Sequence, residues 1–250
     1  MRNKVKVLNI NIDSISKIQL LNELKTGVVF TPNVDHLMKL QKNIHFYKSY
    51  FYADWIICDS KIVSMASKFL GASIVETIPG SSFFRDFYNF HKSNSEIKIF
   101  LLGAASGVAK KAMIEINNQI GREIIVGAHS PSFGFEQDLQ ECDDIIELIN
   151  NTDATVLVLG VGAPKQEIWI GQYKERLKNI KIFMALGATI DFEAGNVKRA
   201  PKFFQYVGIE WFYRLLKEPK RLWKRYLVDD MPFFYLILRQ KIGTYTNPFE

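Results

Sequence analysis

Short runs of apolar, largely β-branched residues recur along this chain, and each is closed by small or polar residues and followed by a helical pattern. The runs are GVVFTPN (27–33), ADWIICDS (53–60), IKIFLLGAASG (97–107), ATVLVLGVGAPKQ (154–166) and IKIFMALGATIDF (180–192). Continuous apolar strands separated by helices are typical of a parallel sheet that is buried on both faces. The sequence therefore predicts an α/β fold: a Rossmann-like, mostly parallel sheet with helices on both faces.

The composition fits a folded protein with a sizeable core. The chain has 250 residues, of which 48% are hydrophobic and 23% charged, values typical of globular domains. Cys58 and Cys142 lie among apolar neighbours without metal-site spacing, which predicts buried thiols in a reducing compartment. The N-terminus lacks the apolar run of a signal peptide, and no stretch approaches the roughly 20 apolar residues of a membrane span. We expect a cytoplasmic protein.

The positive charge of the chain is concentrated near its C-terminus. Residues 198–225 contain nine Lys and Arg and two Glu, a net +7, which exceeds the +6 of the whole chain. Pro201 marks the predicted end of the α/β body, so residues 1–205 are predicted to form the catalytic domain and residues 206–250 a helical, basic C-terminal appendage. Whatever this charge attracts should bind at the appendage.

The segment WFYRLLKEPKRLWKRYL (211–227) has two faces at helical spacing. Pro219 predicts two short helices that meet near residues 218–219. One stripe is apolar and the other face is basic, a pattern typical of a helix on an anionic membrane surface; the stripe is Phe212, Leu215, Leu216, Leu222, Trp223 and Tyr226. Docking of this stripe onto the α/β body is the alternative. A nucleic-acid partner is not expected, because the rest of the chain contributes no basic surface.

Polar residues follow several of the predicted strands. In open α/β sheets, ligands bind beyond the carboxyl ends of the strands. The polar residues at these ends are Thr31, Asn33, Asp59, Ser106, Gln166, Glu167, Thr189 and Asp191. Turns are polar in any case, so part of this set is expected only to cap helices.

Two glycine-rich turns are candidate ligand contacts. Gly103 and Gly107 flank Ser106, which is placed to cap the next helix, and exposed amides at such a helix start can hold a phosphate. Gly162 precedes Gln166, whose carboxamide could bond a sugar or a base. Neither turn is a complete nucleotide-binding motif, so ordinary turn chemistry is the alternative for both.

Asp59 is the candidate general base, because a carboxylate emerging from a buried strand gains a raised pKa; the alternative is that it caps the following helix. Asp191 and Glu193, at the end of a strand, form the nearest approach to a metal-binding DxD, which the chain lacks. The acidic pairs at 143–144 and 229–230 are predicted to be solvated. No metal and no cofactor are expected.

From about Val5 to Tyr226, the chain resembles the WecG/TagA/CpsF family of bacterial glycosyltransferases. The motifs are TPNVDHL (31–37), VLVLGVGAPKQEIWI (156–170), ALGATIDFEAGNVKRAP (185–201) and GIEWFYRLLKEPKRLWKRYL (208–227). The resemblance implies inverting, metal-independent transfer of N-acetylmannosamine, its uronic acid or another hexose derivative from a UDP-sugar. The implied acceptor is a polyprenyl-diphosphate-linked sugar at the inner face of the cell membrane, in teichoic acid or polysaccharide synthesis.

The resemblance also implies roles for individual residues. Asp59 matches the family's proposed base, with Thr31 as a second catalytic residue. The substrate-binding residues that it implies are Asn33, Gln166, Arg214, Arg221 and Arg225. The strand ends and glycine turns add Gly103, Ser106, Gly162, Glu167 and Asp191 to the predicted substrate-binding set, and the basic segment adds Arg199. Backbone amides at the glycine turns and the C-terminal arginines are expected to stabilise the departing UDP.

Two positions depart from the family pattern: Ser60 replaces a glycine and Thr77 replaces an arginine. The donor and acceptor therefore cannot be assigned from the pattern. A homo-oligomer stays open. The alternative functions are a Rossmann-type enzyme that uses NAD or S-adenosylmethionine, and a nucleic-acid-binding protein with a basic arm.

Overall fold

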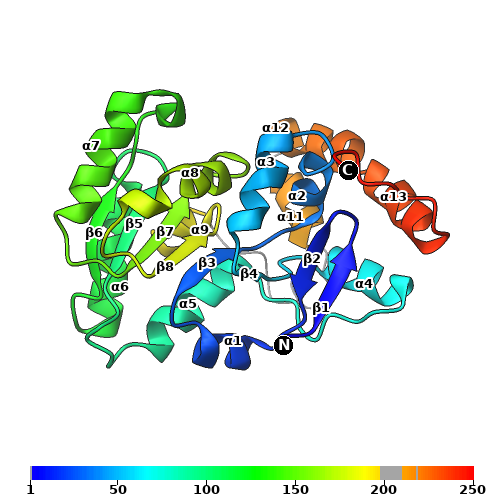
Figure 1. Cartoon of the computed structure of the whole chain (residues 1–250). Coiled ribbons are helices and arrows are strands. Elements are labelled where there is room, and N and C mark those ends of the chain that lie inside the picture. Colours follow the sequence, from blue (N-terminus) through cyan, green and yellow to red (C-terminus); the bar gives the residue numbers. More distant parts are fainter. Residues whose placement is uncertain (1, 198–209, 218) are drawn as a thin grey trace.

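The computed structural model describes residues 2–197, 210–217 and 219–250. Its centre is a six-stranded sheet in the order β4-β3-β8-β7-β5-β6, and all neighbouring strands are parallel (Figure 1). The strands are β3 (Gly27–Phe30), β4 (Trp55–Ile56), β5 (Ile99–Gly103), β6 (Ile125–His129), β7 (Val156–Gly160) and β8 (Ile182–Ala185). The predicted Rossmann-like α/β fold is confirmed.

The strands are buried on both faces. Alternate residues of one strand enter two separate apolar clusters: Val158 belongs to one, whereas Leu157 and Leu159 belong to the other. Because successive side chains of a strand point to opposite faces, each face has its own core. Cys58 and Cys142 are both buried and unpaired, as predicted.

Helices cover both faces of the sheet (Figure 1). The helices of the α/β body are α1 (Lys17–Glu23), α2 (Val34–Lys39), α3 (Ile44–Ser49), α4 (Lys61–Leu70), α5 (Gly80–Phe90), α6 (Val108–Ile120), α7 (Leu139–Asn150), α8 (Lys165–Tyr173) and α9 (Thr189–Glu193). Several begin at a polar side chain that accepts a bond from the first turn, including Asn33 for α2 and Ser60 for α4. Such caps explain why these helices start where they do.

Two parts of the fold were not predicted. Strand β6 forms the edge of the sheet beside β5. At the N-terminus, β1 (Lys4–Val7) and β2 (Ile10–Asp13) form an antiparallel hairpin. Asp13 is buried and accepts a hydrogen bond from the Ile56 amide at 2.8 Å, which ties the hairpin to β4.

The basic segment forms α11 (Glu210–Lys217) and α12 (Pro219–Lys224), followed by a π-helical turn (Arg225–Asp229). The segment is helical on both sides of residue 218, as predicted; the predicted junction at 218–219 includes residue 218, which lies outside the described residues, so the break itself stays a prediction. Leu222 of the predicted apolar stripe is buried, whereas Leu216 and Trp223 are exposed. The stripe is therefore only partly docked on the body. No helix in the described ranges is both long and apolar enough to cross a bilayer.

The last helix, α13 (Pro232–Lys241), packs into the main core. Phe233 and Ile237 belong to the same apolar cluster as the sheet. The side chain of Gln240 accepts a bond from the Leu8 amide at 2.7 Å and donates to the Lys6 carbonyl at 3.1 Å. A truncation at residue 205 would therefore remove part of the core as well as the basic segment.

Candidate active site

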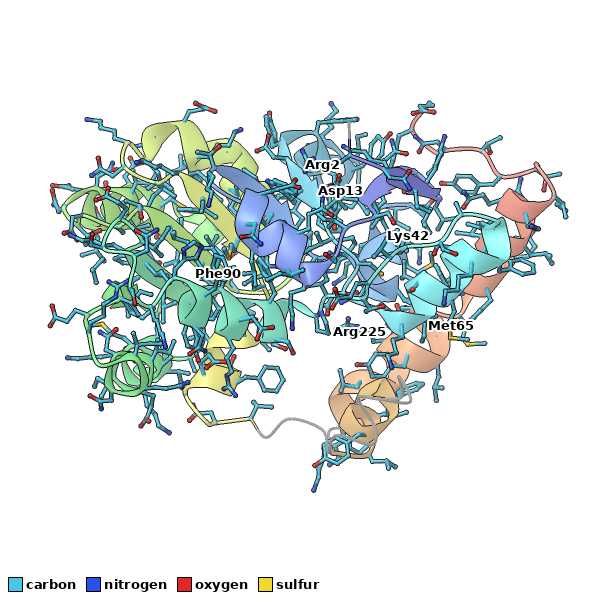
Figure 2. The ribbon with its side chains drawn as sticks, turned by 90° about the horizontal axis from the view of Figure 1, so that it is seen from below. Arg2, Asp13, Lys42, Met65, Phe90 and Arg225 are labelled. Atoms are coloured by element: carbon cyan, nitrogen blue, oxygen red, sulfur yellow. The ribbon has the colours of Figure 1, made fainter. Side chains whose placement is uncertain are left out.

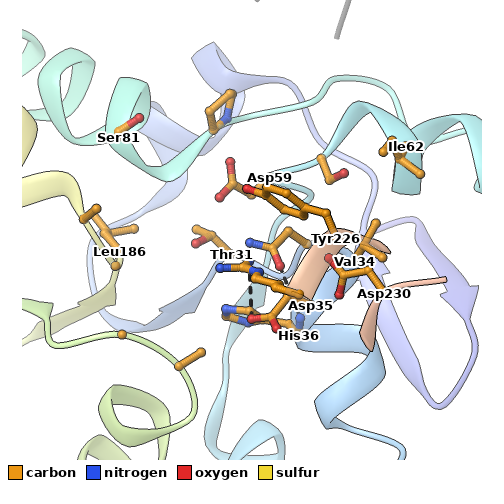
Figure 3. A pocket seen from close by; sticks show the side chains of 18 of the residues that line it. Thr31, Val34, Asp35, His36, Asp59, Ile62, Ser81, Leu186, Tyr226 and Asp230 are labelled. Carbon is orange, nitrogen blue, oxygen red and sulfur yellow. Dashed lines mark hydrogen bonds and ion pairs between the residues drawn. The ribbon is translucent and has the colours of Figure 1, made fainter. Parts of the chain in front are cut away.

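A cavity of about 640 Å³ lies beyond the carboxyl ends of β4, β3, β8 and β7. Its walls come from the starts of α2, α4, α5, α8 and α9 and from the C-terminal helices (Figure 3). Of the predicted site residues, Thr31, Asn33, Asp59, Gly162, Gln166, Asp191 and Arg225 line it. This is the position in which parallel α/β sheets bind ligands.

Asp59 lies in the wall of the cavity, half-buried, at the junction of β4 and α4. The cap of α4 is the neighbouring Ser60, whose hydroxyl accepts from the Val63 amide. The alternative in which Asp59 caps this helix is therefore wrong. The Asp59 amide donates to the Pro32 carbonyl at 3.1 Å. This bond fixes the backbone that carries the carboxyl group.

Thr31 and Asn33 follow β3 on the floor of the same cavity. The Thr31 hydroxyl is buried and donates to the Ala185 carbonyl of β8 at 3.3 Å. The Asn33 side-chain oxygen accepts from the His36 amide at 3.2 Å, which caps α2. Each residue thus has a structural bond in addition to its place at the cavity, and that bond fixes its orientation.

Gln166 links two glycine turns of the cavity wall. Its side-chain oxygen accepts from the Gly162 amide at 3.2 Å and from the Gly187 amide at 3.1 Å. Its side-chain nitrogen donates to the Glu167 carboxylate at 2.8 Å. A carboxamide has two acceptor sites and two donor hydrogens, so only one N–H remains for a ligand. Gln166 holds the turns after β7 and β8 together.

Replacing Gln166 by leucine is expected to lower the free energy of unfolding by about 2–4 kcal/mol. The Gly162 and Gly187 amides would lose their acceptor in a partly buried setting, and each unmet bond costs about 1–3 kcal/mol. Urea denaturation measures the change. Gln140→Leu is the matched control, because Gln140 is exposed on α7 and, among the described residues, its side chain bonds Asp144 alone; a similar loss in both variants would contradict the linking role.

Glu167 lies behind the cavity wall, fully buried. Burial raises its pKa to about 7, although the bond from Gln166 acts in the opposite direction. Its carboxylate lies 3.9 Å from Nδ1 of His36. Burial lowers the pKa of His36 to about 3, so this histidine is neutral, and its Nδ1 bonds the Tyr50 hydroxyl at 2.9 Å. Glu167 therefore does not line the cavity; it accepts a bond from Gln166, which does.

Replacing Glu167 by glutamine is expected to flatten the dependence of stability on pH. The folded-state pKa of about 7 exceeds the ordinary 4.5, so the folded protein binds the extra proton across this window. Its unfolding free energy therefore falls as the pH rises from 4.5 to 7, by about 3 kcal/mol. His36 acts with the opposite sign, because its pKa is lowered, and its contribution is lost as the pH falls from 6.5 towards 3.

The difference between wild type and variant therefore isolates Glu167. Urea denaturation at pH 5 and pH 8 gives the two values for each protein. The loss of stability between these pH values should be larger in wild type than in Glu167→Gln. Equal losses would mean that Glu167 does not titrate in this range.

A cluster of charges joins α2 to the C-terminal segment. The Asp35 carboxylate pairs with Lys39 at 2.8 Å and with Arg225 at 3.3 Å. Asp230 is buried close by, and its pKa is raised to about 7 by burial and then by Asp35. The prediction that the acidic pair at 229–230 is solvated is wrong for Asp230, because α13 docks into the core. Arg225 is thus placed at the cavity by a partner on α2.

Gly103 and Ser106 do not line the cavity. Gly103 has φ +138°, and a Cβ there would lie 2.6 Å from the Gly160 carbonyl. This glycine permits close approach of β5 and β7. Ser106 is exposed, and α6 is preceded by Gly107 without a side-chain cap, so its predicted capping role is wrong.

Asp191 and Glu193 lie on the helix α9 and not at the end of a strand, since β8 ends at Ala185. Asp191 faces the cavity, whereas Glu193 is bonded to Arg85 at 3.0 Å and Tyr88 at 2.9 Å. Residues two apart on a helix point in different directions. Within the described part of the chain, no three His, Cys, Asp or Glu side chains are grouped to hold a metal ion.

Several cavity residues were not predicted as site residues. These are Ser81, Ser82 and Lys39, together with Tyr226, which was assigned to the apolar stripe, and Asp230, which was predicted to be solvated. Ser81 and Ser82 stand in the first turn of α5 after Pro79 and Gly80, a helix-start signal that could have found them.

Both departures from the family pattern, Ser60 and Thr77, also line the cavity. Arg199 lies outside the described residues, as do the side chains of Arg214 and Arg221. The structure therefore places Arg225 alone among the predicted arginines.

Comparisons with known proteins agree on one family. The model of the glycosyl transferase WecG/TagA/CpsF family matches residues 5–247. Curated relatives from Staphylococcus aureus strains MRSA252 and MW2 are each 26% identical over 248 residues, which cover 95% of this chain and 93% of the relative. Both are named N-acetylglucosaminyldiphosphoundecaprenol N-acetyl-beta-D-mannosaminyltransferase.

Proposed function

Because the chain belongs to the WecG/TagA/CpsF family of glycosyl transferases, we propose that it transfers an N-acetylmannosamine-like sugar, with inversion, from a UDP-sugar to a polyprenyl-diphosphate-linked sugar. The relatives' name identifies such a lipid-linked acceptor. Membership of a glycosyl transferase family does not support the alternative functions, which were an enzyme that uses NAD or S-adenosylmethionine and a nucleic-acid-binding protein. The products would enter teichoic acid or another cell-surface polysaccharide.

The observation that carries this proposal is a carboxylate and an arginine in one cavity. Asp59 (Figure 3) comes from the turn after β4 and Arg225 from the C-terminal segment, and both line the space beyond the strands. Transfer from a nucleotide sugar needs a base for the incoming hydroxyl and positive charge for the departing diphosphate. These two residues supply one group of each kind.

In the proposed reaction, the acceptor hydroxyl oxygen attacks the anomeric carbon of the donor while Asp59 takes the hydroxyl proton. The bond between that carbon and the diphosphate oxygen breaks, and UDP leaves with the electron pair. Arg225 and Lys39 lie where they can stabilise the new charge. The Gly162 amide is already bonded to Gln166, so the expectation that this turn donates to UDP does not hold at Gly162.

The proposed enzyme needs no resident metal, because cationic side chains take the place of a bound ion. The lack of a DxD motif and the family resemblance support this. Thr77 borders the cavity where the family pattern has arginine. A shorter, neutral side chain at this point would change the recognition of the donor or acceptor sugar, so the sugar itself has to be measured.

We also propose that the protein works as a peripheral protein at the inner membrane face. Leu216 and Trp223 are exposed on α11 and α12, next to Lys217, Lys220 and Lys224. Apolar side chains mixed with lysines are typical of helices that bind anionic lipid. The possible homo-oligomer stays a prediction.

The decisive experiment is an assay of UDP release from a panel of UDP-sugars, with polyprenyl-diphosphate-linked N-acetylglucosamine as acceptor. Release should require the acceptor and should be fastest with UDP-N-acetylmannosamine or a close relative. A chelator should leave the rate unchanged. Absence of release with every donor would overturn the proposed reaction.

A further inference from the structure

Helices α4 and α13 pack side by side (Figure 2). Each buries one face: Val63 and Ala66 of α4, and Phe233 and Ile237 of α13. Beside these buried faces, about 100° around each helix, lie large apolar side chains that are between 50% and 69% exposed; these are Met65, Phe69, Phe234, Leu238 and, just after α13, Ile242. Core packing explains the first set but not the second.

The exposed set follows helical spacing. Met65 and Phe69 are four residues apart on α4, and Phe234, Leu238 and Ile242 repeat the same interval along α13 and just beyond its end. Residues at this interval lie on one side of a helix. Two stripes on adjacent helices make a large exposed apolar surface, which in soluble proteins marks a binding site. We call these residues, together with Ile62, the α4–α13 surface.

This surface is continuous with the mouth of the cavity. Ile62 and Phe234 belong both to the α4–α13 surface and to the cavity lining, and the exposed side chains of Met231 and Leu227 also line the cavity. At the far end, the Lys241 ammonium lies 5.5 Å from the centre of the Phe69 ring and links the two helices. An apolar path therefore leads from the cavity outwards for the length of α4, about 15 Å for ten residues.

We propose that the α4–α13 surface binds the prenyl chain of the acceptor lipid. This inference rests on the proposed function, since it concerns the acceptor of the same reaction. The acceptor hydroxyl has to reach Asp59 inside the cavity, so the diphosphate on the other side of the acceptor sugar and the first carbons of its chain lie towards the mouth, where Ile62, Met231 and Phe234 begin the apolar path. Lys61 and Lys68 on α4 and Lys241 on α13 border the path with positive charge, which suits a lipid diphosphate and the surrounding anionic headgroups.

Direct binding tests the inference without any transfer step. Wild type and the double variant Met65→Ser/Phe69→Ser are titrated in detergent with a polyprenyl diphosphate and with a short-chain alkyl diphosphate. The variant should weaken binding of the prenyl probe at least about tenfold, because burial of such a side chain contributes about 1.5–3 kcal/mol. Binding of the short probe should not change.

The variant positions are exposed, so the fold should persist, and a thermal unfolding curve checks it. Leu238→Ser on α13 provides an independent second variant with the same expected selectivity. The matched control is Ile114→Ser on α6, where Ile114 is 49% exposed but belongs to another helix outside the cavity lining. This control should bind both probes as wild type does.

Three results would overturn the inference. The first is equal affinity of wild type for both probes, and the second is equal weakening of both probes in the variants. The third is that the variants bind the prenyl probe as wild type does but sediment as monomers where wild type sediments as a dimer. The surface would then be a contact between two copies of the chain. Failure of the proposed function is separate, since it appears as absence of UDP release while prenyl-selective binding persists.

Discussion

Replacing Asp59 by asparagine is expected to lower kcat for sugar transfer by about 10²-fold or more, the usual effect of losing a general base. Asparagine keeps the size of the side chain but cannot take the proton of the acceptor hydroxyl. Ser60, and not Asp59, caps α4, so the change should leave the helix and the fold intact. Initial rates of UDP release, with a thermal unfolding curve as the check on folding, measure the effect.

Asp191→Asn is the matched control for this prediction. Asp191 is also a partly exposed carboxylate of the cavity, but it comes from α9 on the other side. We expect its replacement to affect KM for the donor more than kcat. Near-normal turnover in Asp59→Asn together with an inactive Asp191→Asn would reassign the base to Asp191.

Replacing Arg225 by glutamine is expected to lower kcat/KM by roughly 10²-fold. Loss of one positioned donor at a developing negative charge costs about 10²–10³ in rate, and a salt bridge to Asp35 is lost as well. Asp35 keeps its partner Lys39 at 2.8 Å, so the Asp35 carboxylate is not left without a cation. Steady-state kinetics with a saturating acceptor measure the change.

Lys224→Gln is the control for Arg225, because Lys224 is the adjacent cation, is exposed and does not line the cavity. It should retain most of the activity on a soluble acceptor. Arg225→Lys should recover only part of the rate, since an ammonium cannot offer the two-pronged donor of a guanidinium. If Lys224→Gln loses as much as Arg225→Gln on that acceptor, net charge and not position is what matters.

The sheet and the position of Asp59 were predictable because both depend on local pattern. Buried parallel strands are continuous apolar runs, and all parallel strands end at one edge of the sheet. These patterns put Asp59, after β4, on the same edge of the sheet as Thr31, after β3. The strand order does not appear in such patterns. Gly103 also ends a strand, yet β5 lies beyond β7, and its glycine serves backbone packing instead of the cavity.

Residues that are adjacent in one motif also occupy different environments in the structure. Gln166 and Glu167 stand together in the sequence, but successive residues of a helix point about 100° apart, so one lines the cavity while the other is buried behind it. The bonds of Gln166 to Gly162 and Gly187 connect loops that are far apart along the chain. No local pattern encodes such a link.

The sequence by itself determined the parallel α/β body, the basic and aromatic character of the C-terminal segment, and a candidate site at the strand ends, because hydrophobic periodicity, charge and turn chemistry are local properties. Only the tertiary structure decided which apolar residues of the C-terminal helices are buried and which stay exposed. Leu222 and Phe233 dock on the body, while Phe234 and Leu238 face outwards beside Met65 and Phe69. Which residues are buried depends on contacts between segments that are distant in the chain. The same contacts bring Arg225 to the cavity and leave the α4–α13 surface exposed beside its mouth.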